Sequence, residues 1–301
     1  MSKKKTKKKN KFLSAIISVL IILVAMAFLG RPTGIEVIDN SKVFIFLSDI
    51  GNQFRSGNNI NVPATDGLEL PAPIKGHQIV NHTGYTLSWN KEMLAADWVA
   101  YELTAEEVNS QEASRKGESF KADPSVFTSP EENDYKGVGN LRPHPAARGH
   151  LAPAADFHWS AEAMADTFYY TNVCVQYQFY NAGIWLQAED AVRNCAEKTG
   201  KVYVVTGPVL TDGPYEKFKD KLNIFKSFYK ALLVVTDNGT EAVALVIPQD
   251  ANKKTPLIDF AMSINELEEL TKIDFFPALE DSVEEQIESS YNKSFWVSTF
   301  K

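Results

Sequence analysis

Short runs that are apolar or that alternate apolar with polar residues recur along the chain after residue 76, and they predict β-strands. Thr83-Gly84 separates the first two runs and Asp237-Asn238-Gly239 the last two, so each pair is expected to form a hairpin. The run that ends at Thr104 leads into Ala105-Glu106-Glu107, a capping-box start for a helix. Strands are therefore predicted at residues 77–82, 85–90, 98–104, 167–173, 202–206, 231–236 and 242–247.

One segment has a clear helical period. Between residues 182 and 198, apolar residues recur at spacings of three and four, which predicts an amphipathic helix that packs on one side and ends at Gly200. Residues 156–165 and 263–270 predict shorter helices, and residues 109–147, rich in Ser, Gly, Pro, Asn and charge, predict loops. The sum is a single α+β domain built on a mostly antiparallel sheet.

The first 30 residues have the pattern of an export signal. Lysines are followed by an apolar run at 12–24 and by the small residues of Ala25-Met26-Ala27, which permit cleavage after Ala27. An uncleaved membrane anchor fits the same residues. We expect residues 1–30 to be a signal or anchor, 31–68 a linker and 69–301 the folded domain. The domain is then exported: periplasmic, secreted or held at the membrane.

Charge and cysteine content limit what the predicted exported domain could do. Seven of the 31 basic residues lie in the first 30, which contain no acid, so the rest carries 24 basic and 38 acidic side chains. A nucleic-acid enzyme of this charge needs a local basic cleft, because its net charge repels phosphate. Cys174 and Cys195 permit a disulfide in an exported protein, but a buried free thiol fits Cys195 at least as well.

The candidate chemistry is concentrated between residues 148 and 189. Arg148-Gly149-His150-Leu151-Ala152-Pro153 is followed by Asn172, then by Asn181-Ala182-Gly183-Ile184-Trp185, then by Glu189. A histidine can deprotonate water near neutral pH, and an asparagine oxygen can bind a hard cation such as Mg²⁺. These groups suffice for a one-metal phosphodiesterase.

The order and spacing of these blocks resemble the DNA/RNA non-specific endonucleases, a ββα-metal (His-Me finger) nuclease family, over about residues 70–280. The resemblance implies that fold, with an active-site helix, Mg²⁺ or Mn²⁺ as the metal, no nucleotide cofactor, and DNA and RNA as substrates. It also implies the role of each candidate residue: His150 as general base, Asn181 as metal ligand, Glu189 acting through metal-bound water, Asn172 shaping the site, and Arg115 and Arg148 contacting phosphate.

Each assignment has a structural alternative. Asn181 could serve as a helix N-cap, Glu189 as an exposed carboxylate paired with Arg193, and either Arg115 or Arg148 as a surface ion pair. The remaining histidines lack such a motif and are interpreted as ordinary loop or surface residues: His77, His82, His144 and His158.

The chain departs from the family pattern at Ala147, where the family block begins with aspartate, and residues 140–146 look like an insertion. Asp134 or Asp156 could replace the missing carboxylate. We therefore carry a second hypothesis, a catalytically weak or inactive binding module at the cell envelope, and a third, a phosphodiesterase for smaller substrates. A membrane contact through the N-terminal segment and a homodimer both stay open.

Overall fold

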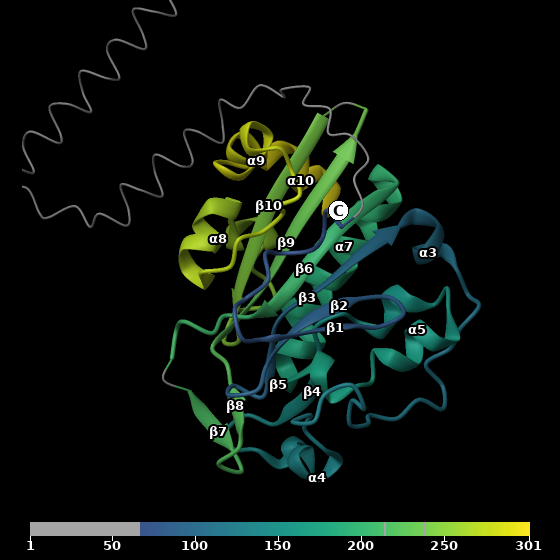
Figure 1. Ribbon diagram of the computed structural model, residues 1–301, viewed down its shortest axis with the longest axis vertical. Coiled ribbons are helices and arrows are strands. Elements are labelled where there is room, and N and C mark those ends of the chain that lie inside the picture. The colour runs from purple at the N-terminus through teal and green to yellow at the C-terminus, as the bar shows by residue number, and fades with distance from the viewer. Residues whose placement is uncertain (1–66, 214, 238) are drawn as a thin grey trace, which may run out of the picture. The chain divides into compact units, whose positions relative to one another are not determined.

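The computed structural model describes residues 67–301 except 214 and 238 (Figure 1). The expected signal segment and nearly all of the expected linker lie outside these residues. Within the described part, a seven-stranded antiparallel sheet has the order β1-β2-β3-β6-β9-β10-β11. Its strands are β1 (Gln78–Asn81), β2 (Thr86–Asn90), β3 (Ala95–Thr104), β6 (Lys201–Pro208), β9 (Ser227–Thr236), β10 (Gly239–Pro248) and β11 (Ala261–Met262).

Both faces of this sheet are buried, because alternate residues of its central strands pack on opposite sides. On β3, Val99 and Tyr101 belong to one hydrophobic cluster, and Trp98 and Ala100 to the other. The first face is covered by α7 (Leu186–Thr199) and α10 (Lys293–Thr299). The second is covered by α8 (Ile264–Thr271) and α9 (Asp281–Glu288), yellow in Figure 1. The result is a sheet between two helical layers.

A second, smaller sheet carries the candidate site. β4 (Ala146–His150) pairs antiparallel with β5 (Val173–Tyr177), so that His150 lies opposite Val173. The chain then continues through α6 (Gln178–Tyr180) and η4 (Asn181–Trp185) into α7. This succession of two strands and a helix is the ββα unit. It brings His150, at the end of β4, beside Trp185 at the end of η4.

Local signals account for much of the remaining secondary structure. Capping boxes open α3 (Ala105–Asn109) and α8, and Gly200 ends α7 with a φ of 85°. The predicted hairpins β1–β2 and β9–β10 are confirmed. The other described elements are α4 (Glu132–Tyr135), η1 (Val138–Asn140), η2 (Ala154–Phe157), α5 (Ala161–Asp166), η3 (Tyr170–Asn172), β7 (Glu216–Phe218), β8 (Leu222–Ile224) and η5 (Leu257–Phe260).

Two predictions of secondary structure were wrong. Residues 167–173 do not form a strand: they pass through the 3₁₀ turn η3, and β5 begins only at Val173. Residues 109–147 are not all loop, because they include α4, η1 and the start of β4. Cys174 and Cys195 are both buried and free. Over residues 67–301, apart from the two undescribed positions, no helix is long and apolar enough to cross a membrane.

Candidate active site

His150 is the last residue of β4, and its side chain lies between two aromatic rings. The Phe120 ring centroid is 5.2 Å from the imidazole, and that of Phe168 is 5.3 Å away in an edge-on arrangement. The residue is 8% exposed, and its Nε2 atom is buried without a hydrogen-bond partner among the described residues. Trp185 donates a hydrogen bond to the His150 carbonyl at 3.3 Å and so ties the helical segment to the end of the strand.

Two exposed guanidinium groups lie over the rings that hold this histidine. Arg148 Cζ is 4.8 Å from the centroid of Phe120, and Arg115 Cζ is 5.6 Å from that of Phe168. These are cation–π distances. Neither arginine forms an ion pair with a described residue, so the structure does not support the surface ion-pair alternative. Two unpaired cations therefore lie beside one buried imidazole.

This environment keeps the imidazole neutral. Burial, together with the positive charge of Arg115, lowers the pKa of His150 from 6.5 to about 3. A neutral imidazole can accept a proton, and a phosphate bound by the arginines would offset the charge that opposes protonation. Electrostatics and geometry thus favour an anion beside His150.

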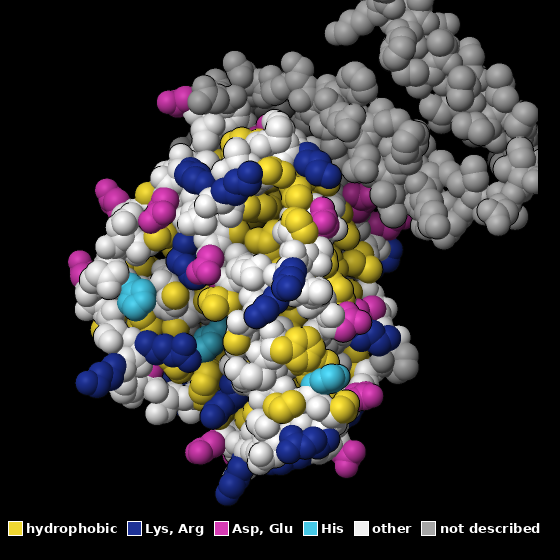
Figure 2. All heavy atoms as spheres, turned by 180° about the vertical axis from the view of Figure 1, so that it is seen from behind, with side chains coloured by type: hydrophobic (Ala, Val, Ile, Leu, Met, Phe, Trp, Pro, Cys, Tyr) yellow, Lys and Arg dark blue, Asp and Glu magenta, His cyan; other side chains and the backbone are white. Residues whose placement is uncertain are grey.

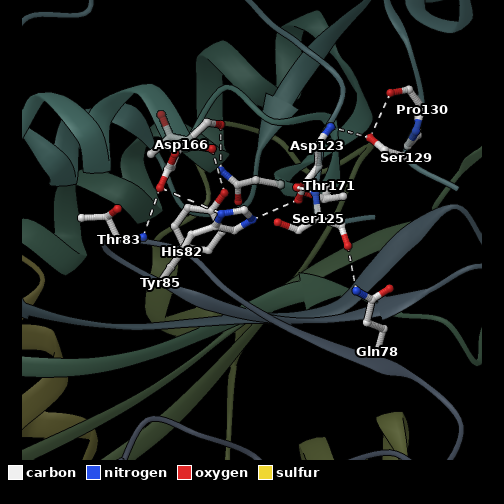
Figure 3. Close-up of polar contacts among 12 residues, drawn as sticks. Gln78, His82, Thr83, Tyr85, Asp123, Ser125, Ser129, Pro130, Asp166 and Thr171 are labelled. Carbon is white, nitrogen blue, oxygen red and sulfur yellow. Dashed lines mark hydrogen bonds and ion pairs between the residues drawn. The ribbon is translucent and has the colours of Figure 1, made fainter. Parts of the chain in front are cut away.

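The loop that carries Arg115 and Phe120 is held in place by a buried polar network (Figure 3). Asp123, on this loop, accepts hydrogen bonds from Thr171 at 2.6 Å and from the Ser125 backbone, and contacts His82 Nε2 at 3.0 Å. Although burial raises it, the hydrogen bonds from His82 and Thr171 hold the pKa of Asp123 below its usual value. Three distant segments of the chain therefore meet at one carboxylate.

Asn172 lies directly before β5, the strand that pairs with β4, and is completely buried. Its side-chain amide donates to the carbonyls of Ala152 and Thr167 at 2.9 and 3.0 Å, and its oxygen accepts from the Ala152 backbone at 2.9 Å. The Leu151 backbone donates to the Asn172 carbonyl at 3.0 Å. These bonds fix the chain directly after His150, and Asn172 keeps no free group toward a substrate.

Asn181 does not cap a helix. Its φ and ψ of −58° and −44° are helical, and the helical path already begins at Gln178, whereas an N-cap residue has extended backbone angles. The path is broken two residues later, at Gly183, whose φ and ψ are −121° and −108°. The predicted single helix from residue 182 is therefore kinked near its start. The Asn181 side chain is half-buried and makes no hydrogen bond to a described residue.

Glu189 is buried rather than exposed, so the alternative of a solvated carboxylate is wrong. Arg193, its suggested partner, binds Asp156 at 2.7 Å and Asp190 instead. Burial raises the pKa of Glu189 to about 7, although the charge of Lys230 opposes this. The same burial lowers the pKa of Lys230 to about 8. The Lys230 ammonium lies 4.4 Å from the Trp185 ring centroid.

The departure at Ala147 leaves an unpartnered group on the opposite strand. Ala147 pairs in register with Gln176, which is completely buried and whose side-chain amide makes no hydrogen bond to any residue that the structure describes. The Gln176 side chain extends over Gly149, where a Cβ atom would lie 2.1 Å from its oxygen. Asp134 and Asp156 do not replace the missing carboxylate: Asp134 binds Lys221, and Asp156 binds Arg193 and Tyr101.

Several histidines are less ordinary than their sequence context indicated. His82 is almost fully buried against Asp123, His77 binds Asp97 at 2.6 Å, and His158 contacts the Ala113 carbonyl at 2.8 Å. The residues that surround the site belong to no candidate motif of the sequence: Phe120, Phe168, Gln176 and Lys230. A buried lysine in a sheet strand is the only one of these that a pattern could have indicated, since lysine is almost never fully buried unless paired.

The donor groups fit a hard divalent cation. The Asn181 amide oxygen is uncommitted within the described residues, and Mg²⁺ is commonly held by one or two protein oxygens, water and substrate phosphate. No group of three or more His, Cys, Asp or Glu side chains in the described residues could enclose a metal by itself. An ion at this site would therefore depend on Asn181, water and the bound phosphate.

Comparisons with known proteins agree with this geometry. The sequence model of the DNA/RNA non-specific endonuclease family matches residues 64–282. The mitochondrial nuclease EXOG of Danio rerio is 34% identical over 69% of this chain, and nuclease C1 of Cunninghamella echinulata var. echinulata is 31% identical over 71%. The matches span 63% and 89% of those two proteins, so the chain covers less than two thirds of the first. A crystal structure of the EndoG/EndoGI complex matches with a TM-score of 0.61 and 27% identity, covering 67% of this chain and 86% of that one.

Proposed function

The chain belongs to the DNA/RNA non-specific endonuclease family, and on that basis we propose that it is a metal-dependent endonuclease that hydrolyses phosphodiester bonds of DNA and RNA. One observation carries the proposal: a buried, neutral imidazole lies beside two guanidinium groups, and neither its Nε2 atom nor these groups have a polar partner within the described part of the chain. The arginines suit a phosphodiester, and the imidazole suits the removal of a proton from water.

In the proposed reaction, Arg115 and Arg148 bind the phosphate and balance its negative charge. His150 accepts a proton from a water molecule, and that water attacks phosphorus in line with the leaving 3′ oxygen, giving a 5′-phosphate product. Asn172 holds the backbone after His150, so that the base keeps its position through the reaction. His150 and Asn172 act from places fixed by buried contacts, whereas the two arginines lie exposed over the rings of Phe168 and Phe120.

Asn181 would hold the divalent cation, Mg²⁺ or Mn²⁺, through its amide oxygen. When bound, such an ion stabilises the charge that develops on the phosphoryl and leaving oxygens. Glu189, one helical segment further on, would orient water in the ion's outer shell, and Lys230 balances its charge inside the protein. The kink at Gly183 lies between Asn181 and Glu189, so the proposed metal ligand and the proposed outer-shell residue belong to different helical segments.

Digestion of plasmid DNA and of RNA by the purified full chain tests the proposal, with Mg²⁺, with Mn²⁺ and with a chelator. We expect cleavage only with metal, and none from the His150→Ala variant, which should retain its fold. The Glu197→Ala variant is the matched control, because Glu197 is exposed on the same helix as Glu189. A wild-type protein that cuts neither substrate with either metal would favour the binding module instead, as Ala147 and the net negative charge do.

We also propose that the domain is exported. The seven lysines and the apolar run at residues 12–24 support this, and the same segment would provide the membrane contact if it stays uncleaved. Fractionation of expressing cells, followed by N-terminal sequencing, distinguishes cleavage after Ala27 from a retained anchor. Recovery of the protein in the cytosolic fraction alone would contradict export.

A further inference from the structure

Three aromatic side chains, two exposed and Tyr177 partly buried, form a cluster at the end of the β4–β5 pair away from His150, which we call the aromatic shelf (His144, Tyr177 and Phe179). The ring centroids of Tyr177 and Phe179 are 5.8 Å apart at an angle of 20°, and His144 lies 5.1 and 5.4 Å from them. Phe179 is 46% exposed, one of few large apolar side chains so exposed in the described chain. His144 belongs to the segment, residues 140–146, that departs from the family pattern.

The backbone beneath the shelf is fixed. Ala146 pairs in register with Tyr177, and the Gln178 backbone donates to the Pro145 carbonyl at 2.8 Å. The Tyr177 backbone donates to Gln249 Oε1 at 2.6 Å, and Gln249 itself is buried. The rings are thus presented on rigid segments, and a ligand that stacks on them would not have to order the backbone that carries them.

The shelf is continuous with the proposed reaction centre. Phe179 precedes Asn181 by two residues, and His150 lies four residues beyond Ala146 on one strand, roughly 13 Å away. Phe179 also borders a hollow of about 500 Å³, large enough for a nucleotide, whose other lining residues include Gly183, Asp250 and Lys253.

The charges around the shelf are mixed: burial and the nearby carboxylate of Glu216 raise the pKa of Tyr177, whereas cations lie toward the hollow and toward His150. Lys253 lies at the hollow with Asp250 as the one carboxylate of its lining, and Arg148 lies between the shelf and His150 on the same strand. Figure 2 shows one face of the molecule, on which lysine and arginine side chains are spread among exposed hydrophobic groups and carboxylates. Aromatic rings with cations alongside are the features by which proteins bind single-stranded nucleic acid.

We propose that the aromatic shelf stacks an unpaired nucleobase of the strand being cleaved, so that single-stranded DNA and RNA are the preferred substrate class. In a duplex, neighbouring bases already cover each base face, whereas an unpaired base offers its face to Phe179. The phosphates on either side of this base would lie toward Lys253 and toward Arg148. This proposal rests on the proposed function for its substrate, but the binding it describes needs no catalysis.

Binding is measured with the full-length His150→Ala protein and a chelator, using fluorescence anisotropy of a labelled oligothymidylate of about 12 nucleotides, within the site sizes of such proteins. We expect Phe179→Ala in this background to weaken binding by about 5- to 150-fold, the effect of losing one stacked base. Phe179→Tyr should restore it, because tyrosine keeps the ring. Leu186→Ala, which removes another exposed apolar side chain at the start of α7, should change binding less than two-fold.

A duplex of the same length completes the binding test, and here Phe179→Ala should have little effect. Three results would contradict the proposal that the shelf stacks a base. Phe179→Ala could weaken binding of single strand and duplex equally, it could weaken binding no more than Leu186→Ala does, or it could leave binding unchanged. Cleavage by the otherwise native protein separates the two proposals. If it cuts no substrate but binds single strands through Phe179, the endonuclease fails and the shelf stands. If it cuts single strands and duplex equally well with and without Phe179, the shelf fails and the endonuclease stands.

Discussion

The burial of a neutral His150 predicts a specific dependence of stability on pH. The imidazole has an ordinary pKa of 6.5 when the chain is unfolded and about 3 in the folded protein. Between these values the unfolded chain binds a proton that the folded protein does not. His150 therefore costs no stability above pH 6.5 and progressively more as the pH falls from 6.5 toward 3. At pH 5 the loss relative to pH 7.5 is about 2 kcal/mol.

Replacing His150 with glutamine or asparagine removes this titration. Each substitution also changes packing between Phe120 and Phe168, but that cost does not vary with pH. We therefore expect each variant to lose about 2 kcal/mol less than the wild type between pH 7.5 and pH 5, whatever its stability at either pH. For a domain of this size the difference corresponds to about 4–8 °C in Tm.

The assay is urea unfolding of the three proteins at the two pH values, followed by tryptophan fluorescence and by circular dichroism. The quantity of interest is the difference in unfolding free energy between the two pH values, compared across variants. The glutamine and asparagine variants should show the same change in unfolding free energy between the two pH values, because both lack the imidazole. Parallel pH dependence in wild type and both variants would show that the imidazole is not held neutral, and the argument for a proton-accepting His150 would fail with it.

Other substitutions test the remaining site. Ala147→Asp should give Gln176 a hydrogen-bond partner across the hairpin and raise turnover on plasmid DNA by about 100-fold, or about 2.7 kcal/mol of transition-state stabilisation; an unchanged or lower rate contradicts this. Asn181→Ala should raise the Mg²⁺ concentration needed for half-maximal cleavage, with partial rescue at high Mg²⁺. Glu189→Gln should lower turnover more mildly than Asn181→Ala, with little change in the Mg²⁺ concentration needed. If Glu197→Ala lowers activity equally, the losses in the other two variants reflect destabilisation of the fold and not a change at the site.

The sequence predicted the elements whose cause is local. The period of the α7 segment, its end at Gly200 and the hairpins at Thr83-Gly84 and before Gly239 depend on neighbouring residues, and each was found. The strand predicted at residues 167–173 was wrong because the segment is rich in aromatic and β-branched residues, which favour strands. There, Tyr170 instead stacks on Tyr135 at 4.8 Å, and Thr171 binds the loop that carries Arg115.

The surroundings of the candidate site could not be predicted in the same way. Phe120 and Phe168 come from segments 30 and 18 residues away from His150 along the chain, and no periodic pattern relates them to it. The pKa of Glu189 is raised by burial and lowered by the charge of Lys230, which lies on a central strand of the large sheet. Motif order therefore points to candidate reacting groups, whereas their protonation states depend on non-local packing.

The same packing bears on the choice between an enzyme and a binding module. A buried nitrogen without a hydrogen bond, such as Nε2 of His150, costs about 1–3 kcal/mol of stability. A protein that only binds nucleic acid gains nothing from this cost, because Arg115 and Arg148 alone would contact phosphate. A hydrolase needs that nitrogen free, since a proton must reach it from water. Ala147 and a Gln176 side chain with no hydrogen-bond partner among the described residues fit an enzyme whose hairpin is less firmly supported, and they leave His150, the arginines and Asn181 in place.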